Sequence, residues 1–156
     1  MKNSSLWAPW RIKYLRDKLQ KGCIFCQALN TKRKDYVILK SKYSIALLNI
    51  YPYNNGHVMV APIKHIRDLR RLKEEEALDL FRVLNKTTDS LEKILKPDGF
   101  NIGLNISRAA GAGITGHLHI HIVPRWIGDA NFMTTVSNTR VISQSLKELY
   151  RRLKNA

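Results

Sequence analysis

The chain is poor in acidic residues, in cysteines and in long apolar stretches, and each shortage excludes a class of protein. Two cysteines among 156 residues are too few for a disulfide framework. No stretch reaches the ~18 consecutive apolar residues that a membrane-spanning helix needs. The sequence MKNSSLWAPWRIKYL has no continuous apolar segment and no small-residue cleavage site, which argues against a secretory signal. We therefore expect a cytoplasmic protein that does not span a membrane.

The shortage of acidic residues leaves a large positive charge. The sequence has 27 Lys and Arg against 12 Asp and Glu, a formal net charge of +15. Eleven of the basic residues fall in positions 1–43, where Asp17 and Asp35 are the opposing acids. Such a field attracts nucleic acid, anionic membrane surfaces or polyphosphate-bearing metabolites. A solvated basic surface with no specific partner carries equal weight at this point.

Sequence patterns predict a single α+β domain over 1–156, with residues 1–35 as a basic N-terminal arm. Runs rich in β-branched and aromatic residues predict strands. Apolar residues at three- and four-residue spacings, such as Leu80, Phe81 and Leu84, predict one long helix. Strands are expected at 36–40, 44–50, 57–62, 100–107 and 117–124, and helices at 74–95 and 143–154. The result is an antiparallel sheet of about five strands, with the long helix packed across it and a C-terminal helix.

Three of the five histidines alternate along GHLHIHIVPRW, residues 116–126. Because side chains alternate across a strand, His117, His119 and His121 are expected on one face, and the intervening apolar residues on the core face. Clustered histidines indicate a metal site or proton and phosphoryl chemistry. Inert histidines on a strand surface are the less favoured alternative.

The loop RAAGAGITG, residues 108–116, precedes the histidines and contains three Gly and three Ala. Small side chains allow backbone amides to approach a ligand closely, and exposed N–H groups hold phosphate oxygens. A tight strand connection is the alternative.

Cys23 and Cys26 form a C-x-x-C pair, a spacing that suits either a zinc site or a redox pair. No thioredoxin-like βαβ pattern accompanies the pair, which disfavours the redox alternative.

The histidine stretch HLHIHIVP resembles the His-x-His-x-His signature of the histidine triad (HIT) superfamily of nucleotide hydrolases and transferases. Residues 46–65 resemble the paired strands that carry an Asn and a Gly-His in this family. Residues 99–133 and 6–15 are similar to one branch, the bacterial diadenosine tetraphosphate phosphorylase-like (ATP adenylyltransferase-like) proteins. The resemblance covers nearly the whole chain.

This resemblance implies the roles of individual residues. His119 would be the nucleophile that attacks the α-phosphorus of a nucleoside polyphosphate, and His121 and His57 would contact the phosphates. A neutral imidazole is a competent nucleophile near pH 7. Its attack would give a nucleotidyl-histidine and release the leaving group, and a second acceptor could then take up the nucleotidyl group. The implied substrate-binding residues are Leu47, Asn49, Asn105, Gly111, Ala112 and Gly113.

One departure bears on the choice of reaction. The hydrolase and phosphoramidase branches commonly carry Gln four residues before the first triad histidine, where this chain has Gly113. We therefore expect phosphorolysis of diadenosine tetraphosphate to ATP and ADP, with inorganic phosphate as second substrate and no membrane partner. A dinucleoside polyphosphate hydrolase or nucleoside phosphoramidase that uses water is the alternative. A basic nucleic-acid-binding module is less favoured.

The resemblance also implies a metal and a second copy of the chain. Several relatives hold structural zinc with two cysteines, a later histidine and the first triad histidine, and a closed set of four such ligands is structural rather than catalytic. HIT proteins are generally dimeric, so a homodimer is expected. Whether Mg²⁺ or Mn²⁺ assists the reaction is left open. The implied zinc ligands are Cys23, Cys26, His65 and His117.

Overall fold

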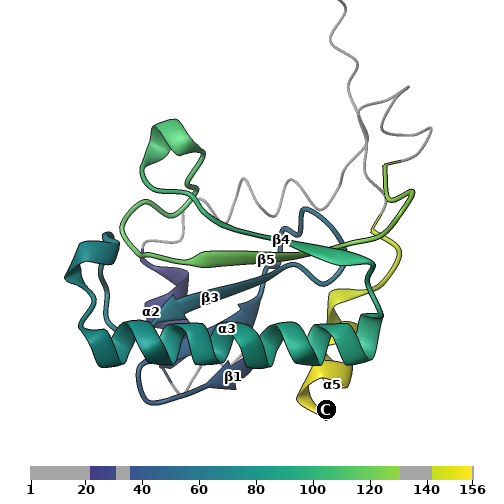
Figure 1. Ribbon diagram of the computed structural model, residues 1–156, viewed down its shortest axis with the longest axis horizontal. Helices are drawn as coiled ribbons and strands as arrows, with labels where there is room; N and C mark the ends of the chain where they lie inside the picture. The colour runs from purple at the N-terminus through teal and green to yellow at the C-terminus, as the bar shows by residue number, and fades with distance from the viewer. Residues whose placement is uncertain (1–21, 31–35, 131–141, 156) are drawn as a thin grey trace, which may run out of the picture.

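The computed structural model describes residues 22–30, 36–130 and 142–155. Its five strands form one antiparallel sheet in the order β1-β2-β3-β5-β4 (Figure 1). The α+β prediction is therefore confirmed. The family-like stretch at 6–15 and most of the predicted basic arm lie outside the described residues, so the single domain over 1–156 stays a prediction. The strands are β1 (Val37–Lys40), β2 (Ser44–Leu48), β3 (Val58–Pro62), β4 (Gly99–Leu104) and β5 (Ile120–Arg125).

The long helix α3 (Glu74–Leu95) lies across one face of this sheet and has the predicted bounds. Three glutamates occupy its first turn, where negative charge is favourable, and the Glu76 carboxylate accepts a hydrogen bond from the Lys73 N–H at 3.0 Å. Lys96 ends the helix in the left-handed conformation. Phe81, predicted on the buried stripe, is instead 57% exposed, because its neighbours Leu80 and Leu84 take the core side.

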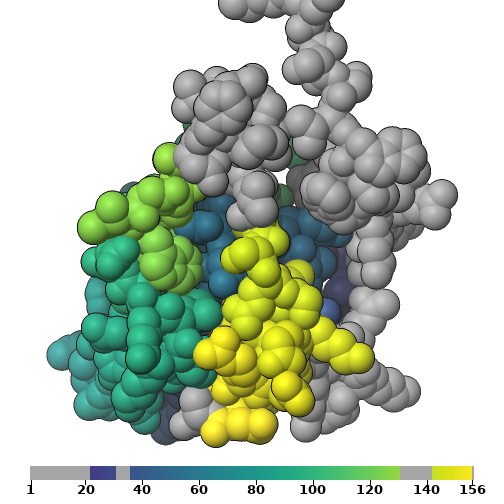
Figure 2. Space-filling model, turned by 90° about the vertical axis from the view of Figure 1, so that its right-hand side faces the viewer, coloured from purple at the N-terminus to yellow at the C-terminus, as the bar shows by residue number. Residues whose placement is uncertain are grey.

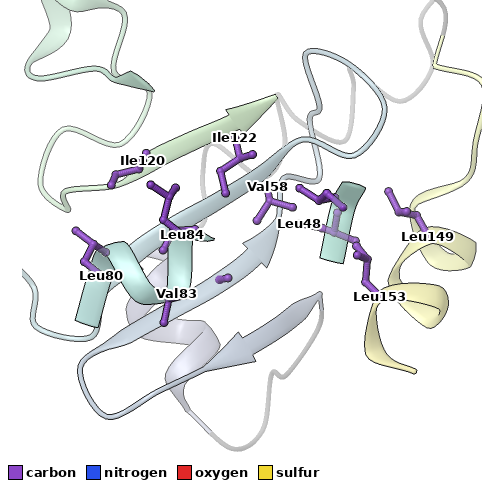
Figure 3. Packing of buried hydrophobic residues seen from close by; sticks show 12 residues of the cluster. Leu48, Val58, Leu80, Val83, Leu84, Ile120, Ile122, Leu149 and Leu153 are labelled. Carbon is purple, nitrogen blue, oxygen red and sulfur yellow. The ribbon is translucent and has the colours of Figure 1, made fainter. Parts of the chain in front are cut away.

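The main core lies between α3 and the sheet (Figure 3). The register pairs Val58 with Ile122, so their side chains share the face that packs on Leu80 and Leu84. The C-terminal helix α5 (Leu146–Lys154) adds Leu149 and Leu153 to this core. It lies beside the end of α3 (Figure 2), where the Arg152 guanidinium donates to the Ile94 carbonyl at 2.7 Å.

The opposite face of the sheet is also covered. A six-residue helix, α2 (Ile24–Leu29), places Phe25 on a second buried cluster with Ile45, Leu47 and Met59. The sequence patterns did not predict this helix, because six residues are too few for a periodicity to show. Two 3-10 turns, η1 (Leu69–Arg71) and η2 (Arg108–Ala110), complete the described elements. No helix within the described ranges is long and apolar enough to cross a membrane.

The strand predicted at 117–124 is displaced. Regular pairing begins at Ile120 and runs to Arg125, so His117 and His119 precede β5 and His121 lies within it. The backbone before Ile120 pairs elsewhere, since the Leu118 N–H donates to the Ile66 carbonyl at 2.6 Å.

Candidate active site and metal centre

The histidines gather on the face of the sheet opposite α3, and they are buried. His117, His119 and His121 are 1, 4 and 8% exposed, and His57, directly before β3, is fully buried. An inert row of surface histidines is thereby excluded. The register places Met59 beside His121, so β3 and β5 bring His57 and His121 together.

His119 is held in one tautomer. Its Nδ1 lies 2.8 Å from the carbonyl oxygen of His117, which can only accept a hydrogen bond, so Nδ1 carries the proton. The lone pair therefore lies on Nε2. Burial lowers the pKa of His119, and the ring is neutral near pH 7. A neutral imidazole with a free Nε2 is chemically a nucleophile.

A chain of hydrogen bonds holds His121 in the opposite tautomer to that of His119. The Tyr53 N–H donates to Nδ1 of His57 at 3.1 Å, so His57 carries its proton on Nε2. That Nε2 lies 2.8 Å from Nδ1 of His121, which must accept. His121 is consequently protonated on Nε2 and presents a donor, while the ring of Tyr53 packs on both histidines at centroid distances of 4.4 and 5.6 Å.

This chain of histidines is uncharged at neutral pH. Burial, together with the neighbouring His121 and His119 rings, lowers the pKa of His57 to about 3. Burial and His119 lower the pKa of His121 to about 4. Both rings therefore act as hydrogen-bonding groups rather than as cations.

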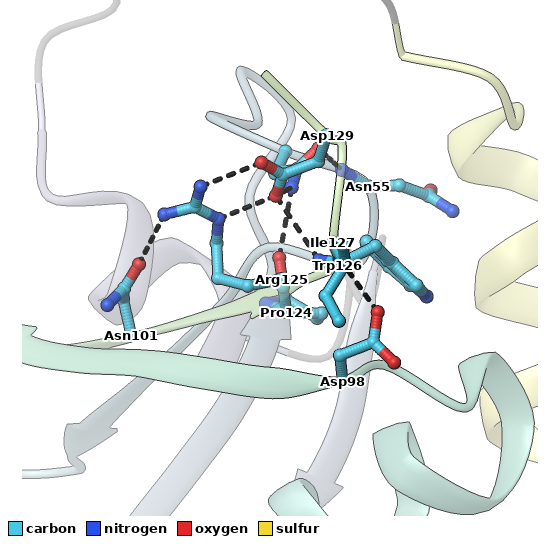
Figure 4. A network of polar contacts seen from close by, with 9 residues as sticks. Asn55, Asp98, Asn101, Pro124, Arg125, Trp126, Ile127 and Asp129 are labelled. Atoms are coloured by element: carbon cyan, nitrogen blue, oxygen red, sulfur yellow. Dashed lines mark hydrogen bonds and ion pairs between the residues drawn. The ribbon is translucent and has the colours of Figure 1, made fainter. Parts of the chain in front are cut away.

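A polar network fixes the turn that carries His57 (Figure 4). Arg125 donates to both carboxylate oxygens of Asp129, at 2.6 and 2.7 Å, and to the side-chain oxygen of Asn101 at 2.7 Å. Asn54, buried in the turn, donates to the same carboxylate at 2.8 Å and to the Pro124 carbonyl at 3.0 Å. These bonds hold Asp129 as an anion, and the Arg125 contact is the main reason that its pKa falls to about 2. We call this group the Arg125–Asp129 clasp.

The predicted substrate contacts Leu47 and Asn49 lie on the histidine side of the sheet. The Asn49 amide nitrogen is 3.3 Å from Nδ1 of His57, so it belongs to the same network. Leu47 is 6% exposed within the cluster around Phe25. Gly103 pairs with His121, and Asn105 directly follows the end of β4.

Some backbone N–H groups of the Gly/Ala loop already donate hydrogen bonds to carbonyls of the same segment. The Gly111 N–H donates to the Arg108 carbonyl at 2.9 Å, and the Ala112 N–H to the Ser107 carbonyl at 3.3 Å. Within the described part of the chain, the Gly113 N–H has no such partner. Of the three predicted loop amides, that of Gly113 is the one left for a ligand oxygen.

The four predicted metal ligands meet beside His119. Their ligand atoms lie within 4.8 Å of one another: Sγ of Cys23 and Nδ1 of His117 are 3.2 Å apart, as are Sγ of Cys26 and Nδ1 of His65. Zinc bonds of about 2.0–2.3 Å in a tetrahedron separate neighbouring ligand atoms by roughly 3.3–3.8 Å. Two thiols and two imidazoles at these spacings fit such an ion.

The orientation of His117 supports the same fit. Its Nε2 lies 2.7 Å from the Pro62 carbonyl, so Nε2 carries the proton and Nδ1 is a lone pair directed at the cysteines. A ligating histidine usually donates its other N–H to a carbonyl or carboxylate in this way.

Supporting residues of the site were not found from the sequence, among them Phe25, Tyr53, Asn54 and Asp129. Tyr53 acts through its backbone N–H, and Asn54 binds Asp129 through its side chain, contacts that residue type does not reveal. Phe25 had a visible signal, an aromatic residue between the two cysteines, but nothing in the sequence linked it to the histidines.

Residues 30–126 match the family model described as HIT domain, which covers more than half of the chain. The chain therefore belongs to the HIT family. Among characterised relatives, the AP-4-A phosphorylase of Mycobacterium tuberculosis is 35% identical, over 95% of this chain and 81% of that protein.

Solved structures agree. A hypothetical histidine triad nucleotide-binding protein from Sulfolobus tokodaii is 30% identical, with a TM-score of 0.68 over 85% of this chain and 87% of its own. A zinc-bound histidine triad family protein from Mycobacterium smegmatis is 27% identical, with a TM-score of 0.70 over 86% of this chain and 91% of its own. The fold implied by the resemblance is thus confirmed.

Proposed function

We propose that this chain is a nucleotidyltransferase that cleaves dinucleoside polyphosphates through a nucleotidyl-histidine on His119. The observation that carries the proposal is the tautomer of His119, whose Nδ1–H is bound to the His117 carbonyl, so that the lone pair lies on Nε2. HIT membership and the 35% identity to an AP-4-A phosphorylase support an enzyme that acts on nucleotides.

The proposed reaction has two in-line steps. Nε2 of His119 attacks the α-phosphorus of diadenosine tetraphosphate, a P–N bond forms, the anhydride P–O bond breaks, and ATP leaves. Inorganic phosphate then attacks the adenylyl group, the P–N bond breaks, and ADP leaves with the phosphate as its terminal group. Nε2–H of His121 donates to a phosphate oxygen, because His57 fixes its tautomer. The Gly113 amide is proposed to hold a non-bridging oxygen, while Asn49, Asn105 and the remaining predicted contacts position the nucleotide.

Phosphate is the proposed acceptor for two reasons. The AP-4-A phosphorylase of Mycobacterium tuberculosis is similar over 95% of this chain. The hydrolase-like branches commonly have a Gln where this chain has Gly113. This chain therefore lacks an amide side chain that would contact the leaving oxygen or water.

We also propose that zinc occupies the cluster of Cys23, Cys26, His65 and His117. Zinc bound there would supply structural cross-linking and no open coordination position, since all four tetrahedral sites are taken by protein ligands. Its effect on the reaction would be indirect, through the backbone of His117, whose carbonyl holds His119.

A homodimer through β4 is the proposed assembly. β4 is an edge strand, and its residues Ile102 and Leu104 are 48 and 37% exposed. Their partners across the ladder are Ile122 and Ile120, so they lie on the α3 side of the sheet, where Leu78 and Phe81 are also more than half exposed. An exposed apolar strand edge of this kind favours pairing with another strand.

The test is diadenosine tetraphosphate cleavage with labelled inorganic phosphate. The expected products are equal amounts of ATP and ADP, with the label in the terminal phosphate of ADP and a rate that rises with phosphate concentration. His119→Ala should keep the fold and lose both turnover and the trapped adduct. ATP and AMP without a need for phosphate would instead identify a hydrolase, and an adduct on another side chain would overturn the mechanism.

A further inference from the structure

Phe25 is the residue that joins the cysteine pair to the candidate nucleophile. It lies in α2 between Cys23 and Cys26 and is fully buried. Its ring contacts His117 at a centroid distance of 4.9 Å and His119 at 5.2 Å, tilted by 44° and 37°. One aromatic side chain therefore covers two histidines of the triad.

The two contacts bear on the orientation of His119. The hydrogen bond from its Nδ1–H to the His117 carbonyl requires one orientation of the imidazole, and a ring flipped about Cβ–Cγ would lose that bond. The terminal torsion of histidine is broad and roughly two-fold, so the alternative is accessible unless packing excludes it. Phe25 is fully buried and packs against the His119 ring, so it obstructs the rotation that a flip requires.

We propose that Phe25 is a positioning residue for His119. Its ring, anchored between the two cysteines, holds the imidazole in the orientation that binds the His117 carbonyl and leaves Nε2 free. This inference rests on the proposed role of His119 as the nucleophile.

The test compares Phe25→Leu with Ile45→Ala in the purified, metal-containing protein. Leu keeps an apolar side chain but removes the flat ring. Ile45 is equally buried in the same cluster, where it pairs with Ala61 on β3. The control thus loosens the cluster while Phe25 stays in place. Phe25→Met, which retains more volume, serves if Phe25→Leu does not fold.

Two readouts separate positioning from general support. For Phe25→Leu we expect single-turnover adenylylation of His119 to slow by roughly 10- to 100-fold, with KM changed by less than about 3-fold. In ¹H–¹⁵N spectra at constant pH, His119 should change from a single Nδ1–H tautomer to a mixture. Ile45→Ala should retain the wild-type rate and the single tautomer.

The inference is overturned if Phe25→Leu retains the wild-type rate and tautomer, or if Ile45→Ala loses them equally. The spectra need no substrate. If wild-type protein never forms an adduct on His119, the proposed function fails, while the tautomer comparison still decides whether Phe25 orients the ring.

Discussion

The two ends of the histidine segment are held in place by different chemistry. At its start, His117 lies among Cys23, Cys26 and His65, a donor set whose spacing suits a metal ion. At its end, Arg125 is joined to Asp129 by two charged hydrogen bonds that the chain supplies itself. The first end would depend on the proposed zinc ion, taken up from solution, whereas the second forms with the fold.

The two ends also control different rings. The His117 carbonyl orients His119, so disturbance of the cysteine cluster should act on the proposed nucleophile. The clasp binds Asn54 in the turn that precedes His57, so disturbance there should act on the donor His121 through His57.

Removal of the metal should have the largest effect. A ligand present at 1,000 times its Kd stabilises the folded state by about 4 kcal/mol, and Cys23→Ser should remove most of that contribution. We expect a fall in Tm of roughly 10 °C or more for Cys23→Ser or for chelated protein, measured by circular dichroism beside a zinc determination. Unchanged Tm in metal-free protein would show that the cluster does not stabilise the fold.

Acid should unfold the centre before it affects the clasp. In the unfolded chain histidine binds a proton near pH 6.5, but buried His57 and His121 resist protonation until about pH 3 and 4. The contribution of these two neutral rings to the free energy of unfolding is therefore complete above pH 6.5 and is lost as the pH falls toward 3–4. At pH 5 the loss is about 2 kcal/mol for each ring.

The measurement is urea unfolding at pH 7.5 and pH 5, carried out on chelated protein so that metal release does not contribute. His121→Asn should lose about 2 kcal/mol less stability between these two pH values than wild type does. Equal losses in both proteins would mean that the buried rings do not account for the acid sensitivity.

The sequence predicted α3 closely, because both its ends carry local signals: a glutamate run at the start and the KPDG stretch, residues 96–99, at the end. The start of β5 was misplaced, since alternation predicts which side a histidine faces but not whether its backbone pairs. Here Leu118 pairs with Ile66 instead of joining the sheet.

The site divides in a similar way. The proposed metal ligands came from the C-x-x-C pair together with the resemblance to the HIT family. No sequence pattern indicated the supporting residues, because their partners are remote in the chain. Asn54 binds Asp129, 75 residues away, and Phe25 contacts His117 and His119. Such contacts depend on how β3, β5 and α2 pack, which no local pattern encodes.

Loss of the clasp should have a moderate effect. Asp129→Asn keeps the shape but removes the charge that binds Arg125, and we expect a loss of about 1–2 kcal/mol, or a few degrees in Tm. His121 should lose part of its fixed tautomer while His119 keeps its own, as measured in ¹H–¹⁵N spectra. Equal disturbance of both rings would contradict the division between the two ends.

A surface ion pair provides the smallest expected effect and the matched control for the clasp. Asp68 binds Arg70 and, like Asp129, has a pKa lowered to about 2, mainly by its arginine partner. The Arg70 side chain is 89% exposed, however, whereas that of Arg125 is 36% exposed. Solvent screens an exposed pair and its side chains lose entropy when they are held together, so a similar pKa does not imply a similar stability. Asp68→Asn should therefore leave the Tm and both histidine tautomers unchanged, and a fall in Tm as large as that of Asp129→Asn would show that burial does not distinguish the two pairs.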